Sequence, residues 1–349
     1  MNQRRFSADE LLASHEYAEP QREAGFLLHG GLDATGHYIP PRSLHRPRAI
    51  RAWTEGLHER GGAPLAADAS LLGGIRCPNA GQMKLLLEEG LGQTFWNTLT
   101  ITGHIEARGR ILADIQFPDF QAAVVQDVSE MAVGHLAGGL LRAHGLDEGG
   151  EPDQGIGGHD VMWFALRDLA FGETSYAAPE IPENIARPDA GTRRWPEIAE
   201  PIEQTLGLLL NLLLIEFRAE LGFQLSEDLL RDPELFTDRR EQALKAAELV
   251  GRIREDEKIH VESLRVILGE IRSLDFRTDS DRTLSGAEMI DPFWNAIVTW
   301  ATVEQPLENA RRQREMLTGR ILEHPNGEAL LERFEALGEW IEESPKASG

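Results

Sequence analysis

The pair Glu257 and His260 carries the clearest chemical signal in the sequence. The two residues lie three positions apart in a long segment with a helical pattern, so their side chains share one helix face and can reach one metal ion. The same face carries the segment's apolar residues, namely Val250, Ile253, Leu264, Ile267, Leu268 and Ile271. A carboxylate and an imidazole facing a core need compensation. Either a cation supplies it, or the pair is only a buried Glu–His hydrogen bond or part of a stripe that emerges into solvent.

Two further carboxylates are predicted to face the interior. Glu216 lies in the apolar segment 212–217, where an ionised group needs a strong partner, either an arginine from another helix or a cation. Glu220, one turn later, is a reserve candidate. Glu106 continues an apolar stripe that runs through Leu91, Phe95, Leu99 and Thr102. These two positions add one carboxylate from each of two more predicted helices.

A fourth predicted helix contributes His135, whose carboxylate partner is less clear. Glu130 precedes it by five residues, which turns Glu130 about 140° away on a regular α-helix. A π-bulge near Gly134 brings Glu130 onto the same face. On a regular helix, Asp127 is the alternative carboxylate.

The elements that must position these residues are long helices. The pattern predicts helical segments at 79–116, 119–144, 159–171, 201–230 and 238–271, with weak points at glycines in the first and a turn-rich stretch at 147–158. Two more helices are expected at 286–322 and 326–343. No strand-rich region or repeat is evident, so we expect an all-α protein in which two helical hairpins are joined by a long crossover at 146–200.

Three regions are expected along the chain. Residues 1–78 are rich in Gly, Pro, Arg and His and read as an irregular extension packed on the main body, with a short helical patch at 49–59. Residues 79–272 form the metal-binding four-helix bundle, and residues 273–349 a C-terminal helical extension. The histidines of the first region share no helical spacing and are expected at surface or loop positions; they are His15, His29, His37, His45 and His58.

This inventory resembles the ferritin-like di-iron carboxylate superfamily, in which two helices each give a Glu and the other two each give a Glu/His pair. The resemblance covers about 85–272. It implies a ferritin-like four-helix bundle with metal ligands at Glu106, Glu130, His135, Glu216, Glu257 and His260. His104 and His159 are candidate extra ligands.

The resemblance also implies a chemistry. Two Fe ions, or a Mn/Fe pair, would react with O2 as co-substrate, which makes the chain a non-haem di-iron oxidase or oxygenase acting on a small organic substrate. A small-molecule substrate and an electron donor or reductase are the expected partners, and a homodimer is allowed. The other classes are a metal-free structural helical bundle and an iron-binding ferritin-like protein without an organic substrate.

Composition narrows the partners and the compartment. The formal net charge of −23 disfavours nucleic acid and anionic membrane surfaces. The single cysteine, Cys77, fits a reducing compartment, and the first residues lack the apolar stretch of a signal peptide, so a cytoplasmic location is expected. The glycine-rich segment 155–159 follows no predicted strand, which disfavours a phosphate-binding loop.

Overall fold

The computed structural model describes residues 4–172, 176–183, 185, 187, 189, 191–280 and 282–339. Most of these residues are helical, which confirms the all-α prediction at this level. Strands in the described ranges form only three two-stranded antiparallel hairpins. They pair β1 (Gln21–Glu23) with β2 (Phe26–Leu28), β3 (Gly31–Leu32) with β4 (Tyr38–Ile39), and β5 (Asp275–Arg277) with β6 (Thr283–Ser285).

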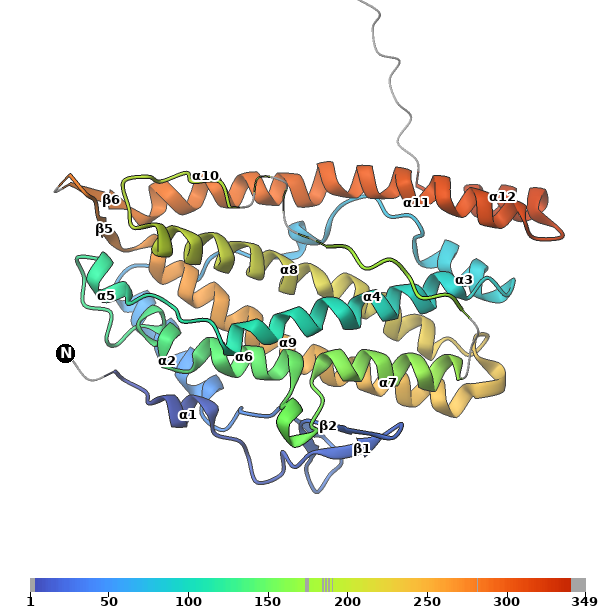
Figure 1. Ribbon diagram of the computed structural model, residues 1–349, viewed down its shortest axis with the longest axis horizontal. Helices are drawn as coiled ribbons and strands as arrows, with labels where there is room; N and C mark the ends of the chain where they lie inside the picture. Colours follow the sequence, from blue (N-terminus) through green and yellow to red (C-terminus); the bar gives the residue numbers. More distant parts are fainter. Residues whose placement is uncertain are drawn as a thin grey trace, which may run out of the picture.

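Five helices form the centre of the molecule and run along its long axis (Figure 1). They are α4 (Gln93–Gly109), α6 (Leu140–Gly149), α7 (His159–Phe171), α8 (Glu200–Arg231) and α9 (Arg240–Arg272). Helix α8 packs along α9, α7 contacts both α4 and α9, and α6 contacts α4. The predicted segments 159–171, 201–230 and 238–271 are thus confirmed as helices.

Helix α9 shows why the apolar pattern was informative. Every member of its predicted stripe is fully buried, from Val250 to Ile271. Helix α8 begins with Pro201 in its first turn and carries Glu200 and Glu203 there, where acidic groups complement the helix dipole. None of the described helices, α8 included, combines the length and the apolarity needed to cross a membrane.

The predicted helix at 119–144 is wrong. The structure has instead the short α5 (Phe120–Ala123), a stretch without helix, a 3-10 helix (Ala132–Gly138) and then α6. One long-range and one local hydrogen bond take the place of helical ones here: Val125 donates its backbone N–H to the Asp275 carbonyl, and Ser129 donates its own to the Asp127 side chain. Gly139 then takes φ +105°, a left-handed conformation that separates the 3-10 helix from α6.

Helices α6 and α7 together occupy one position in the centre of the fold. Helix α6 continues through Gly149, beyond its predicted end, and the chain leaves as a short excursion over 150–158 that contains the 3-10 turn Pro152–Gln154. It returns to open α7 at His159, so that the two helices lie in line in Figure 1. The excursion separates residues in sequence that remain neighbours in space.

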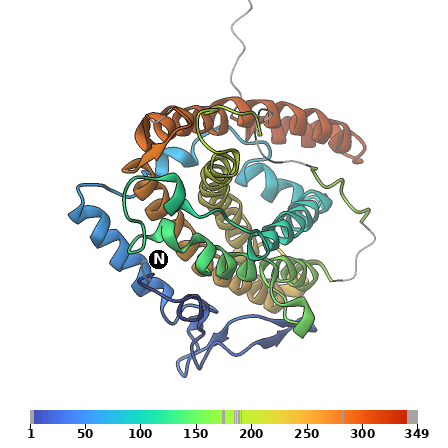
Figure 2. The same ribbon diagram turned by 60° about the vertical axis from the view of Figure 1, so that its left-hand side comes forward.

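The two ends of the chain cover opposite sides of these helices (Figures 1 and 2). On one side lie α1 (Ala8–Leu12) and α2 (Arg46–Glu59), which contact α6 and α9 respectively. On the other lie α10 (Gly286–Thr299), a π-helical turn (Trp300–Glu304), α11 (Gln305–Leu322) and α12 (Gly327–Ala336). The predicted final helix extends to 343, and its last four residues lie outside the described part.

The remaining elements are short. The first predicted helical segment divides at Gly90 into α3 (Ala80–Glu88) and α4, and α3 starts with a reciprocal capping box between Asn79 and Gln82. Three further 3-10 turns complete the described part of the chain: Ala69–Leu72, Arg110–Ala113 and Thr237–Arg239.

Replacing Gly158 with alanine tests the junction between α6 and α7. A Cβ at this position would lie 2.4 Å from the Gly150 nitrogen and 2.6 Å from the Asp147 carbonyl oxygen, both backbone atoms that cannot move aside cheaply. We expect Gly158→Ala to lower the free energy of unfolding by about 1–3 kcal/mol in urea denaturation. The matched control is Gly222→Ala on α8, where a Cβ meets nothing within 4 Å. That change should raise stability by roughly 0.5–1 kcal/mol. Equal effects of the two changes would contradict a tight junction.

Candidate metal centre

Four carboxylates and three imidazoles meet in the middle of the helices. Each exposes no more than 9% of its surface. They are Glu106 from α4, His144 and Glu148 from α6, His159 from α7, Glu216 from α8, and Glu257 and His260 from α9. We call this set the seven-residue cluster.

The cluster forms a polar layer between two apolar cores. On α9, Ile253 belongs to one core and Leu264 to the other, and Glu257 and His260 lie between them. On α8, Leu214 and Phe223 flank Glu216 in the same way. On either side of Glu106, Leu99 likewise belongs to one core and Leu112 to the other. The same holds for Leu141 and Met162 on either side of the α6–α7 junction. The functional groups therefore lie at one level on every helix.

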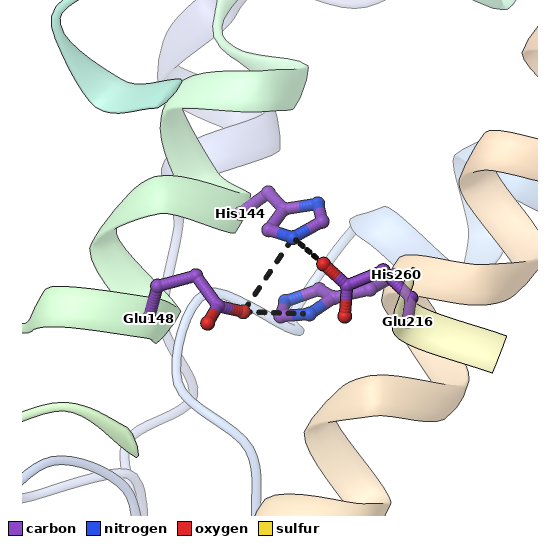
Figure 3. A group of neighbouring side chains, drawn as sticks. All are labelled: His144, Glu148, Glu216 and His260. Atoms are coloured by element: carbon purple, nitrogen blue, oxygen red, sulfur yellow. Dashed lines mark hydrogen bonds and ion pairs between the residues drawn. The ribbon is translucent and has the colours of Figure 1, made fainter. Parts of the chain in front are cut away.

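The cluster divides into two overlapping groups of possible metal ligands. The nitrogen-rich group is His144, Glu148, Glu216 and His260, drawn in Figure 3; the carboxylate-rich group is Glu106, Glu148, His159 and Glu257. Within each group, one ligand atom from every residue lies within 4.8 Å of the others. Glu148 belongs to both. Glu257 also spans them, because its Oε2 lies 3.1 Å from His260 Nδ1 and its Oε1 lies 3.1 Å from His159 Nδ1.

The nitrogen-rich group places two imidazoles side by side. The rings of His144 and His260 stack with centroids 3.7 Å apart and planes 10° apart. His144 Nε2 lies 3.1 Å from Glu216 Oε1 and 3.5 Å from Glu148 Oε1, and His260 Nδ1 lies 3.3 Å from the same Glu148 oxygen. Figure 3 shows these nitrogens facing the two carboxylates.

Two aspartates bind the outer nitrogens of His260 and His159. His260 Nε2 lies 3.1 Å from Asp147 Oδ2, and His159 Nε2 lies 3.1 Å from Asp256 Oδ2. Each of these two imidazoles thus donates its Nε2–H outward and presents Nδ1 to the cluster. Carboxylates in this position fix the tautomer and the ring orientation of histidines that bind metals.

The N-terminal segment supplies the next partners. The Arg46 guanidinium donates to Asp147 Oδ2 at 2.6 Å, and Arg42 donates to Oδ1 at 3.0 Å. On the other side, the Tyr38 hydroxyl donates to Asp256 Oδ2 at 2.9 Å. His29, expected at a surface or loop position, lies in a bend but is buried, with Nε2 3.2 Å from the same oxygen.

Burial and mutual repulsion divide the four carboxylates into two kinds. Burial, together with the charge of Glu148, raises the pKa of Glu106 well above its usual value. Burial and the charge of Glu257 raise the pKa of Glu216 in the same way. Burial alone would also raise the pKa values of Glu148 and Glu257, but His159 and His260 respectively, with hydrogen bonds from the neighbours, lower both. Burial thus favours the protonated forms of Glu106 and Glu216, and the neighbouring imidazoles favour the ionised forms of Glu148 and Glu257.

The imidazoles complement this charge. Burial would lower the pKa of His159, but the charge of Glu148 and hydrogen bonds to carboxylates raise it well above its usual value. Burial would also lower the pKa of His260, but the charge of Glu257 raises it. The pKa of His144 is lowered by burial and by the charge of His260. The imidazoles with raised pKa values, His159 and His260, thus lie beside the carboxylates with lowered pKa values, Glu148 and Glu257.

The donor set fits divalent cations. Three buried atoms that face the cluster make no hydrogen bond of good geometry to any described residue: Glu148 Oε1, Glu257 Oε1 and His159 Nδ1. These atoms do lie 3.1–3.5 Å from groups of opposite charge, but buried polar atoms without a well-aligned hydrogen bond are uncommon. Carboxylate and imidazole ligands without a thiolate suit iron and manganese. Within the described residues, this buried acidic and histidine cluster is thus a group that could bind metal.

The structure brings together four of the six predicted ligands, namely Glu106, Glu216, Glu257 and His260. The other two lie elsewhere. Glu130 is exposed and its carboxylate is 3.9 Å from the Arg5 guanidinium. His135 is buried, but Nε2 accepts the Phe6 backbone N–H at 3.1 Å and Nδ1 faces the Met131 carbonyl at 2.6 Å.

The structure also places the alternative partners of His135 and the extra candidate ligands. The predicted π-bulge near Gly134 is absent, since that segment is a 3-10 helix, and Asp127 is exposed with its carboxylate on Ser129. His159 does join the cluster. His104 is exposed against the Phe164 ring, and Glu220 pairs with Arg254 at 3.0 Å.

His144 and Glu148 were missed by sequence reasoning. Gly145 and the turn-rich stretch after it predicted the end of a helix, whereas α6 continues through both residues. A signal is present: His144 and Glu148 are four apart, so they share a helix face. Glu148 and His159 also flank the 150–158 excursion. Their proximity across the α6–α7 junction reproduces in space the pairing that Glu257 and His260 show in sequence.

No family model, curated protein or solved structure matches this chain in comparisons with known proteins.

Cation binding should release protons from the cluster. Glu106, Glu216, His159 and His260 have raised pKa values and hold protons in the free protein, whereas metal ligands bind in their deprotonated forms. Because the free protein then binds more protons than the metal complex, affinity should rise as the pH rises. Calorimetric titration with Mn²⁺ in two buffers of different ionisation enthalpy measures the release. An affinity that stays constant between about pH 6 and about pH 8 would contradict this protonation pattern.

Proposed function

We propose that this chain is a metal-dependent oxidoreductase that holds two divalent first-row ions in the seven-residue cluster and uses them to activate O2. The observation that carries the proposal is the composition of the cluster: four carboxylates and three imidazoles on five helices, with Glu148 and Glu257 placed between the two groups. The ions proposed are two Fe, or Fe with Mn.

The arrangement of helices supports a ferritin-like bundle. If α6 and α7 count as one interrupted helix, the central positions are α4, α6–α7, α8 and α9. The first two form one hairpin and the last two form another, with 172–199 as the connection between them. This is the connectivity of ferritin-like folds with one long crossover. We therefore propose that fold for the central region.

The chemistry follows from what the side chains can do. A di-iron(II) pair held by these residues would supply electrons for O2 reduction, with the remainder coming from the substrate or from an electron donor, and a small organic substrate would be oxidised or oxygenated. Glu106 and Glu216, whose pKa values are raised by burial and by neighbouring charges, would release their protons when the ions bind and then act as carboxylate ligands. Asp147 and Asp256 keep His260 and His159 oriented. The apolar cores above and below the layer exclude water.

The proposal implies partners. O2 reduction with turnover needs electrons from outside, so an electron donor or reductase is proposed together with a small-molecule substrate. A ferritin-like protein that oxidises iron without an organic substrate would share the same cluster. The two differ in whether an organic molecule is consumed along with O2.

Matched variants on α8 test the proposal. Glu216→Gln removes a cluster carboxylate with little change in volume and should weaken Fe(II) binding at least ~10-fold. O2 uptake by the Fe(II)-loaded protein, followed with an oxygen electrode, should fall accordingly. Glu220→Gln is the control, since Glu220 lies on the same helix and pairs with Arg254. It should bind iron and consume O2 like the unaltered chain.

Three results would decide against the function. Absence of iron binding would remove the metal site, and iron binding without O2 uptake faster than that of free Fe(II) would remove the oxidoreductase. Equal behaviour of Glu216→Gln and Glu220→Gln, with both variants helical by circular dichroism, would place the reacting iron outside the cluster.

A further inference from the structure

The two groups of the cluster differ in chemistry. We propose that they are inequivalent metal positions, in which the nitrogen-rich group selects iron and the carboxylate-rich group accepts manganese, with His144 as the residue that creates the difference. This inference rests on the proposed function, because it assigns identities to the two ions proposed there.

The two positions differ in the number of imidazole ligands. If Glu148 and Glu257 are shared, the nitrogen-rich position keeps two imidazoles and the Glu216 carboxylate for itself. The carboxylate-rich position keeps one imidazole, from His159, and the Glu106 carboxylate. Imidazole ligands suit iron and later first-row metals, whereas carboxylate ligands suit manganese and harder ions. Removing His144 would leave the two positions with equal sets of side chains.

The two positions also differ in the partners of the aspartate that binds each outer imidazole nitrogen. Asp147, behind His260, lies 2.6 Å from the Arg46 guanidinium and 2.8 Å from that of Arg42. Asp256, behind His159, is bound by the Tyr38 hydroxyl and by His29. Two arginines thus bind the aspartate of the nitrogen-rich side directly, whereas among the described residues no arginine binds Asp256, because the nearby Arg252 donates instead to the His29 carbonyl at 2.8 Å. That difference also favours the harder ion beside His159.

Stacking on His260 fixes the orientation of the His144 ring. Its ring stacks on His260 at 3.7 Å, which directs Nε2 toward Glu148 and Glu216. Its Nδ1 is buried and makes no hydrogen bond within the described residues. The histidine is therefore not explained by a second hydrogen-bonding role. Its position favours a ligand that is already oriented before the metal arrives.

Competition between the two metals tests the proposal in the unaltered chain. The protein is incubated without oxygen with equal amounts of Fe(II) and Mn(II), crystallised, and measured by anomalous diffraction at the iron and manganese edges. Iron should dominate at the nitrogen-rich position and manganese should be enriched at the carboxylate-rich position. Equal proportions of the two metals at both positions would overturn the inference while leaving a two-metal site intact. Absence of both metals would instead overturn the proposed function.

A variant assigns the selectivity to His144. His144→Phe keeps an aromatic ring to stack on His260 and removes the nitrogen ligand, so the iron-to-manganese ratio at the nitrogen-rich position should fall at least ~10-fold. His104→Phe is the control, because His104 lies on α4 two residues from Glu106 but is exposed outside the cluster. It should leave both ratios unchanged.

His144→Gln provides a second variant if the phenylalanine does not yield folded protein. An unchanged ratio in either folded variant would overturn the role of His144. A fall of the same size in the ratio at both positions would show that the effect of His144 is not confined to the nitrogen-rich position and would also contradict the proposal.

Discussion

The structure depends on the burial of seven ionisable side chains in one layer. Removing such groups from water is expensive unless charges and hydrogen bonds compensate each other. Here the compensation is internal: His159 and His260, whose pKa values are raised, lie beside Glu148 and Glu257, whose pKa values are lowered, and Asp147 and Asp256 bind the outer imidazole nitrogens. Every element that touches the layer must therefore meet it at one level.

This constraint explains the N-terminal segment, whose sequence indicates little regular structure. Arg42 and Arg46 neutralise Asp147, while His29 and Tyr38 bind Asp256. Arg42 itself has φ +51°, a conformation that non-glycine residues seldom adopt. The segment acts as the outer support of the layer, and residues far from the cluster in sequence become part of its electrostatics. Such support restricts the geometry of ligands more than the ligands can alone.

Sequence periodicity predicted the parts of the molecule that have uninterrupted helices. Glu216, Glu257 and His260 stood out because they are polar residues inside the apolar patterns of α8 and α9. His144 and Glu148 did not, because Gly145 and the glycines that follow are typical of a helix end. The pairing of Glu148 with His159 depends on the excursion returning to its point of departure, and the contacts of His29 and Tyr38 span more than two hundred residues. Local patterns carry no information about such closures.

The central claim is that the polar layer is a two-metal site. The most direct test is metal analysis of the unaltered chain after reconstitution with Fe(II) under reducing conditions and removal of unbound ions. We expect about two iron ions per chain, held by the four carboxylates and three imidazoles. A content below about one ion per chain, in protein that remains helical, would contradict it and leave the layer as a network of buried ion pairs.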